Sequence, residues 1–178
     1  MSTAALIAII IAVPLLCIVI EWLGDTDITE RHHAHHDTYL VPRSVTTALM
    51  LMAVFVGMLG LAVGWLCSVG VFAADASILY GFFAAFLIAT FSMWLGIRRY
   101  RVITFEDRLQ VRPFVGPAIT LRYADITNIY MVRRSFLSSY RNMRVCAGKR
   151  SVTIWGVLNL EQILSRIDRF DTLEGMAP

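Results

Sequence analysis

The chain has 178 residues, of which 57% are hydrophobic, and it carries a formal net charge of +3. Soluble domains are roughly 45–50% apolar, so this composition, with its mean hydropathy of +0.65, argues against a wholly soluble protein. Three cysteines without a CxxC pair exclude a disulfide framework and favour a reducing compartment. Residues 1–96 hold two arginines and six acids, a net charge of −4, whereas residues 97–178 hold fourteen basic residues and seven acids, a net charge of +7. This asymmetry predicts different surroundings for the two halves.

Three long apolar stretches predict membrane-spanning helices. They cover Ala4–Leu23, Thr46–Ala74 and Ala76–Ile97. About 20 apolar residues are enough to cross the hydrocarbon core of a bilayer as a helix. A cleaved signal peptide is the alternative for the first stretch, but it lacks a basic n-region, and no A-x-A-like site precedes Asp25. We therefore expect a first transmembrane helix in residues 1–24 and a transmembrane hairpin in residues 46–97.

The arginines that follow the third stretch indicate which way the chain faces. Arg98, Arg99 and Arg101 come directly after it, and basic residues next to a span favour the cytoplasmic side. The N-terminus is then expected outside. Residues 25–45 and the C-terminal half are expected in the cytoplasm.

Small residues recur at helical spacing in the second and third stretches. The two stripes are Ala53, Gly57, Gly60 and Gly64, and Gly81, Ala85 and Ala89. Such stripes let helix backbones approach closely in lipid. They are explained either by packing within the hairpin or by a docking face for another membrane protein, and both explanations stay open. Ionisable residues occur only at the ends of the spans, at Glu21 and Asp75, which argues against transport by this chain alone.

All four histidines lie between the first two spans. They are His32, His33, His35 and His36, and Asp37 follows directly. We interpret residues 25–45 as a solvated, His-rich cytoplasmic loop. One alternative is a site for a single divalent transition metal formed by these five residues, and another is a pH sensor, because imidazoles titrate at about pH 6.5. The HxxHH spacing resembles one box of membrane di-iron desaturases, but those enzymes need several such boxes, and this chain has one.

After residue 97 the pattern changes to short alternating segments that predict β-strands. They are residues 100–106, 109–114, 118–123, 127–134, 142–147 and 151–155. Turn residues separate them. Residues 159–170 then place apolar side chains at helical spacing, with Asn159 and Gln162 at the positions of a capping box. We expect antiparallel strands closed by one amphipathic helix, and a flexible tail in residues 172–178.

A β-hairpin with an acidic turn, Glu106-Asp107, is followed by an aromatic-x-Asp-Ile step in residues 123–126. This pattern resembles the bacterial PH-like (pleckstrin-homology-like) domains of small membrane proteins, and the match covers residues 98–171. The resemblance implies a membrane α plus β protein of the bacterial inner membrane. Its three transmembrane helices would be followed by a cytoplasmic PH-like antiparallel β-barrel capped by a C-terminal α-helix. Specific phosphoinositide binding is not carried over, because the first hairpin turn is acidic here.

Basic residues are the candidate binding groups of the C-terminal half. We predict that Arg98, Arg99 and Arg101 contact the membrane surface and that Arg133, Arg134 and Arg141 contact a partner. Each charge near an anionic leaflet contributes about 1 kcal/mol, although solvated strand faces would also account for these arginines. Asp125 and Cys146 are expected to be structural, and nothing in the sequence resembles a nucleic-acid-binding module.

The sequence as a whole predicts an integral inner-membrane adaptor or accessory subunit, and not an enzyme. Its PH-like domain would contact a protein or anionic lipid at the cytoplasmic leaflet. Expected partners are membrane lipids and another membrane protein or a second copy of the chain, without nucleic acid. No cofactor is expected unless the histidine segment holds a metal ion. Two alternatives remain: a metal-dependent membrane enzyme or metal/pH sensor using that segment, and a purely structural subunit of a larger membrane complex.

Overall fold

The computed structural model describes residues 2–23, 30–33, 36–133, 141–148, 150–168 and 173–174, with the backbone alone in residues 30–33, 133 and 173–174. The chain divides into two compact units. A helical unit comprises residues 1–27 and 43–97, and a β-unit comprises residues 28–42 and 98–178.

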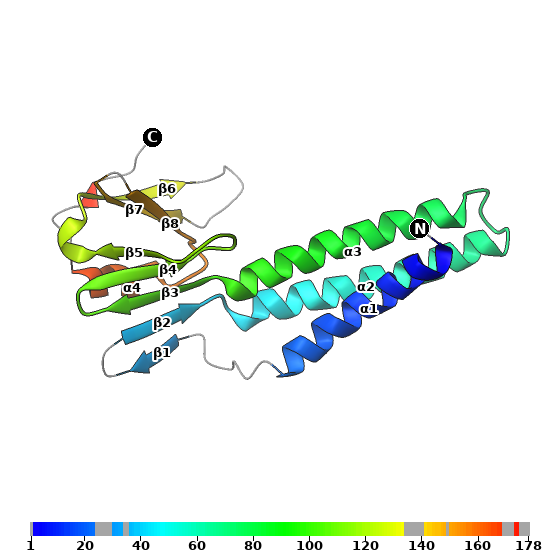
Figure 1. Cartoon of the computed structure of the whole chain (residues 1–178), viewed down its shortest axis with the longest axis horizontal. Helices are drawn as coiled ribbons and strands as arrows, with labels where there is room; N and C mark the ends of the chain where they lie inside the picture. Colours follow the sequence, from blue (N-terminus) through cyan, green and yellow to red (C-terminus); the bar gives the residue numbers. More distant parts are fainter. Residues whose placement is uncertain are drawn as a thin grey trace. The chain divides into compact units, whose positions relative to one another are not determined.

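The helical unit is built from α1 (Thr3–Leu23), α2 (Arg43–Ser68) and α3 (Ala76–Arg99) (Figure 1). Within the described residues, these three helices are long and apolar enough to cross a membrane. The three predicted helices are therefore confirmed as helices.

The second helix ends earlier than the sequence suggests, at Ser68 and not near Ala74. Gly70 has a φ of 80°, a conformation that glycine adopts without a Cβ penalty. The N–H of Gly70 donates to the carbonyl of Cys67, and the N–H of Val71 donates to the carbonyl of Leu66. These are the two hydrogen bonds of a Schellman-type helix end.

The glycine stripe of α2 packs inside the helical unit. A Cβ atom at Gly57 would lie 2.9 Å from the Cγ of Pro14, and one at Gly60 would lie 2.7 Å from the Cγ of Phe83. On α3, by contrast, a Cβ built at Gly81 has no heavy atom of the described residues within 4 Å, apart from its chain neighbours and its own helix backbone. The α2 stripe thus serves packing within the unit, as one of the two explanations predicts.

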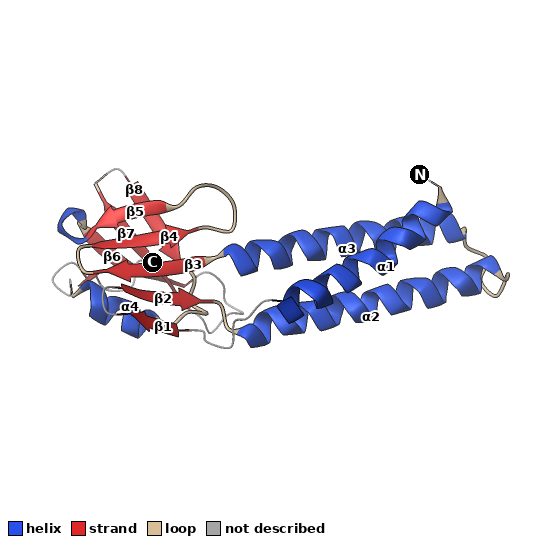
Figure 2. Ribbon diagram, turned by 60° about the horizontal axis from the view of Figure 1, so that its bottom comes forward, coloured by secondary structure: helices blue, strands red, loops and turns tan. Residues whose placement is uncertain are grey.

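The β-unit contains two sheets in its described part (Figure 2). The first sheet has the order β1-β2-β3-β4-β5, with β1 (Glu30–His33), β2 (His36–Leu40), β3 (Arg101–Phe105), β4 (Arg108–Arg112) and β5 (Ile119–Arg122). The second has the order β8-β7-β6-β9, with β6 (Asn128–Arg133), β7 (Arg141–Ala147), β8 (Arg150–Ile154) and β9 (Leu173–Glu174). The short 3₁₀ helix η1 (Tyr123–Asp125) connects the two sheets. All pairings are antiparallel except the parallel pair β6–β9.

The expected closed barrel is wrong for the described residues, because no strand pairing joins the two sheets. The chain leaves β5 through η1, where the N–H of Ile126 donates to the carbonyl of Tyr123. This turn directs the chain away from the edge of the first sheet, so β6 starts a second one. Asp125 lies in this turn, and Cys146 lies partly buried in β7.

The histidine segment is not an irregular loop in its described part. Residues 36–40 form β2, which pairs with β3 with Asp37 opposite Thr104 and Tyr39 opposite Val102. Asp37 and Tyr39 are buried, whereas the other three residues of β2 are half-buried. The expectation of a solvated linker is therefore wrong for residues 36–40, because alternate side chains of this segment complete the interior of the β-unit.

The C-terminal helix α4 (Leu160–Ile167) buries Ile163 and Ile167. Its predicted cap is confirmed, since the N–H of Gln162 donates to Oδ1 of Asn159 over 3.4 Å. The helix ends at Asp168, which adopts a φ of 50°. A flexible tail was predicted in residues 172–178, of which the structure describes only the backbone of β9.

Candidate functional site

The outward face of the first sheet carries four arginines. Val102, Leu109 and Val111 are buried, and because side chains alternate along a strand, the residues between them point outward. The arginines of this face are Arg101, Arg108, Arg112 and Arg122, and we call this set the arginine face. Arg101 lies directly opposite Arg112, and Arg108 lies directly opposite Arg122.

The pairing of like charges in the arginine face has an energetic cost. Like charges directly opposite each other on neighbouring strands are destabilising. Within the described residues, no carboxylate forms an ion pair with Arg101, Arg112 or Arg122, whereas Arg108 lies 3.9 Å from an exposed carboxylate oxygen of Asp107. An anionic partner would relieve this repulsion, so the face is suited to binding negative charge.

Three arginines meet in one pocket of about 280 Å³, which we call the arginine pocket. Its lining consists of Arg99, Arg101, Ile103, Gln110, Arg112, Pro117 and Ala118. The pocket offers guanidinium and amide donors over a partly apolar floor, and its lining includes no carboxylate. Guanidinium groups bind phosphate and carboxylate oxygens through paired N–H donors. The chemistry of the pocket is therefore that of an oxyanion site.

The loop at residues 113–118, between β4 and β5, forms one wall of the pocket and is held at two points. Nη2 of Arg99 donates to the carbonyl of Gly116 over 2.9 Å. The ring of Phe114 stacks on Tyr100, with ring centroids 4.5 Å apart, and meets Trp155 edge-on at 5.5 Å. Gly116 has a φ of 101°, which favours glycine because a side chain is strained there.

Tyr100 supports this aromatic cluster with a buried hydroxyl. The backbone N–H of Trp155 donates to this hydroxyl over 2.9 Å. Burial raises the pKa of Tyr100 above its ordinary value, and the Trp155 hydrogen bond opposes this only in part. The hydroxyl therefore stays neutral at physiological pH and keeps the start of β3 joined to the end of β8.

The predicted membrane-surface arginines fall in or beside this pocket. Arg99 and Arg101 line it, and Arg98 is half-buried at the end of α3. Arg112 is the arginine of the pocket that the sequence analysis did not select. The alternation of Leu109 and Val111 already indicated an outward Arg112, and the Glu106-Asp107 turn would have placed it beside the start of β3.

Two of the three predicted partner-binding arginines, Arg133 and Arg141, lie on the second sheet. Arg133 and Arg141 are directly opposite each other across β6 and β7, and the Arg141 side chain is exposed. Arg134 and the side chain of Arg133 lie outside the described residues. This group therefore remains a prediction from the sequence.

The predicted metal ligands are only partly described. His36 stacks on Phe105 with ring centroids 5.6 Å apart, whereas Asp37 is buried and its Oδ2 lies 3.1 Å from Nε of Arg166. By strand register, His33 pairs with His36 and His32 pairs with Asp37. The side chains of His32 and His33 and all of His35 lie outside the description. No group of three or more metal-ligating side chains occurs in the part that the structure describes.

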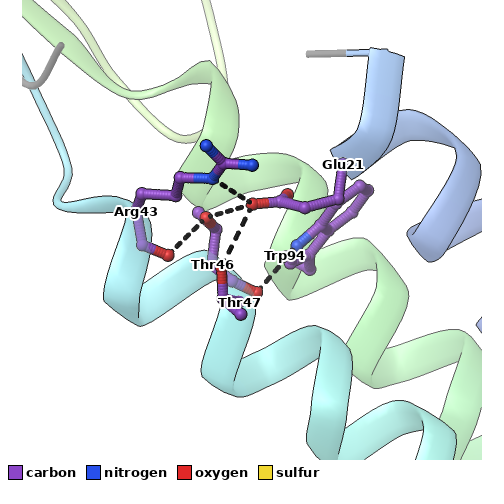
Figure 3. A network of polar contacts seen from close by, with 5 residues as sticks. All are labelled: Glu21, Arg43, Thr46, Thr47 and Trp94. Carbon is purple, nitrogen blue, oxygen red and sulfur yellow. Dashed lines mark hydrogen bonds and ion pairs between the residues drawn. The ribbon is translucent and has the colours of Figure 1, made fainter. Parts of the chain in front are cut away.

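A second polar cluster joins the three helices at one end of the helical unit (Figure 3). Glu21 of α1 is buried, and its Oε1 accepts hydrogen bonds from the hydroxyls of Thr46 at 3.1 Å and Thr47 at 3.4 Å. Nε of Arg43 lies 3.8 Å from the same oxygen, and Nε1 of Trp94 on α3 donates to the carbonyl of Thr46. These partners use the hydrogen-bonding capacity of the carboxylate. We therefore interpret the cluster as a structural contact between the helices and call it the polar joint.

Replacing Glu21 by leucine should destabilise the helical unit by about 1 kcal/mol, because the Thr47 hydroxyl and the half-exposed Arg43 lose their partner, while the Thr46 hydroxyl still donates to the carbonyl of Arg43 over 3.0 Å. Glu21→Gln is the matched control. It keeps an oxygen for the threonine hydroxyls and should retain most of the stability. Thermal unfolding of the full chain in mild detergent measures both. A leucine variant as stable as the starting protein would contradict the polar joint.

Comparisons with protein-family models, with curated proteins and with solved structures found no match for this chain. The fold and the site define a class in structural terms. It combines helices that are long and apolar enough to cross a membrane with a two-sheet β-unit that carries an arginine face and an arginine pocket.

Proposed function

We propose that this chain is an integral membrane adaptor or accessory subunit whose β-unit binds anionic groups at the membrane surface. The observation that carries the proposal is the arginine face, where guanidinium groups are opposed in register and Arg101, Arg112 and Arg122 form no ion pair with described carboxylates. Such a face attracts negative charge, and each of its guanidinium groups offers hydrogen-bond donors and no acceptor. Its chemistry therefore favours binding over catalysis.

The membrane setting is supported by the helices and by the charge at the end of α3. The basic residues of its last turn are Arg98 and Arg99, and basic residues beside a span favour the cytoplasmic side. We place the β-unit in the cytoplasm of a bacterium, at its inner membrane. We also propose that the β-unit is a PH-like domain, on the strength of its acidic hairpin turn, the Tyr123–Ile126 step and the C-terminal helix.

Charge reversal of the arginine face tests the proposal. In Arg108→Glu/Arg122→Glu, the face outside the pocket changes by four charges, which should remove stoichiometrically bound acidic protein from the purified full chain. Arg144→Glu on β7, compared with Arg122→Glu alone, is the matched control, with the same change of charge on an exposed position of the second sheet. Native mass spectrometry in mild detergent reads every bound species.

The result that overturns the proposal is a set of bound species identical in all of these variants and the starting protein, or the absence of any bound anionic species in all of them. Equal thermal unfolding temperatures of the variants must accompany the comparison, so that lost binding is separated from lost folding.

A further inference from the structure

The loop at residues 113–118 has an unusual composition for an exposed turn. Its sequence, PFVGPA, contains no charged or hydrogen-bonding side chain. Val115 is 86% exposed and Phe114 is 37% exposed. Exposed turns are ordinarily polar, and folding does not require a solvent-exposed valine at the tip of the loop.

Arginines surround the base of this apolar tip. Arg112 directly precedes the loop, Arg99 donates to its Gly116 carbonyl, and Arg101 lies opposite Arg112. The loop thus has an apolar end and a cationic base. The membrane interface has the same order, with acyl chains beneath a layer of phosphates.

The chain itself connects the pocket to a membrane-spanning helix. Arg99 is the last residue of α3, and Ile97, two residues earlier, is its last apolar residue. A consecutive Cα–Cα step is about 3.8 Å, so Arg99 cannot lie far from the end of the span. At that depth a bilayer presents lipid phosphates.

We propose that the loop at residues 113–118 enters the headgroup layer and that the arginine pocket binds the phosphate of an anionic phospholipid. This inference rests on the proposed function and names the ligand of one part of the arginine face. Guanidinium N–H groups of Arg101 and Arg112 hold the phosphate oxygens from neighbouring strands. Arg99 contributes a third positive charge while its Nη2 fixes the loop. Phe114 and Val115 contact the acyl chains.

The apolar tip decides between a lipid and a free anion. Soluble phosphate would use the three guanidinium groups and gain nothing from Val115. A phospholipid uses both parts of the structure, because its phosphate and its acyl chains are covalently joined. The lipid is therefore the ligand that accounts for the exposed tip as well as the pocket.

The first test measures lipid binding by the full chain after it has been delipidated in mild detergent. Phosphatidylglycerol, phosphatidylcholine and inorganic phosphate are titrated separately and followed by native mass spectrometry. We expect phosphatidylglycerol to bind, and Arg101→Gln/Arg112→Gln to weaken that binding at least about tenfold, as expected for two lost charge contacts at about 1 kcal/mol each. Arg108→Gln/Arg122→Gln, which removes the same charge outside the pocket, should leave it within about twofold.

The second test places an environment-sensitive fluorophore on Val115→Cys, in a chain whose native cysteines are replaced by alanine. In nanodiscs containing phosphatidylglycerol, its emission should shift to the blue and be quenched by lipids that are spin-labelled near the headgroup. The same fluorophore on Thr153→Cys, an exposed position of β8, should show neither effect. Circular dichroism and thermal unfolding confirm that all labelled chains are folded.

Each outcome decides the inference. Equal binding of phosphatidylglycerol by both double variants, inorganic phosphate that binds as tightly as the lipid, or a fluorophore at Val115 that does not respond to the bilayer would overturn it. The proposed function is tested with variants of Arg108 and Arg122, so its result is independent of the result for the lipid site. Loss of bound protein in Arg108→Glu/Arg122→Glu, together with lipid binding that Arg101→Gln/Arg112→Gln does not change, overturns the lipid site and leaves the adaptor.

Discussion

Replacing Gly60 or Gly64 by valine should unfold the helical unit far more readily than the same change at Gly81. A Cβ atom at Gly60 would lie 2.7 Å from Cγ and 2.9 Å from Cβ of Phe83, and one at Gly64 would meet the ring of Tyr80. Both aromatic side chains are buried and have little room to move. Overpacking of this kind costs about 3 kcal/mol at the upper end of its usual range.

Gly81→Val is the matched control, because in the described part of the chain only its own helix turn lies within 4 Å of its Cβ position. The same side chain added there should change stability by about 0.5 kcal/mol or less. Cys17 provides the measurement, since it is 1% exposed in the folded helical unit. With Cys67 and Cys146 replaced by alanine, the rate at which a thiol reagent labels Cys17 reports opening. Equal labelling rates in the Gly60, Gly64 and Gly81 variants would show that α2 does not pack against α3 as described.

The regular elements were predictable because their signals are local. Apolar length identified the three helices, and alternation identified six of the seven described strands that follow residue 97, all except β9. Asn159 predicted the start of α4 as an N-cap residue, and the hydrogen bond that its side chain accepts from the N–H of Gln162 confirms this role. Where the second helix ends was less predictable, because Gly70 lies inside an apolar run and acts through its conformation.

Strand β2 was missed because its partner lies far away in the sequence. His36–Leu40 pairs with Arg101–Phe105, and one of its inward residues is a carboxylate. A charged residue at an inward position hides a strand from hydrophobic alternation. Only the tertiary structure, which brings Arg166 of α4 to Asp37, makes that position acceptable in the interior.

Part of the candidate site could be predicted from the sequence. Arg99 and Arg101 were chosen for their distance from the third span, a rule that depends on charge alone. The alternation in β4 would have added Arg112. Two contacts depend on how the β4–β5 loop folds back: the hydrogen bond from Arg99 to Gly116 and the stacking of Phe114 on Tyr100. Local sequence patterns do not predict such tertiary contacts.

Asp37 and Arg166 should prove energetically coupled, and this coupling tests whether the histidine segment is part of the β-unit. Oδ2 of Asp37 lies 3.1 Å from Nε of Arg166, with the two side chains 12% and 43% exposed. A charge-assisted hydrogen bond is worth roughly 1.5–3 kcal/mol, and solvent at the half-exposed arginine reduces this. A double-mutant cycle with Asp37→Asn and Arg166→Gln should therefore give a coupling energy of about 1–2 kcal/mol.

The exposed pair Asp107 and Arg108 is the matched control, with its atoms 3.9 Å apart and side chains 69% and 49% exposed. Exposed ion pairs contribute about 0–1 kcal/mol, so the same cycle with Asp107→Asn and Arg108→Gln should give much less. Denaturant unfolding of the full chain in detergent, with and without a metal chelator, measures both cycles. Coupling that rises when the chelator is added would make Asp37 a metal ligand, because a bound cation competes with Arg166 for its carboxylate, whereas coupling that the chelator does not change means that Asp37 anchors β2 to α4. Under that result His36, the neighbour of Asp37 in β2, is held on the outward face of a folded sheet, and any chemistry of His36 must act from there.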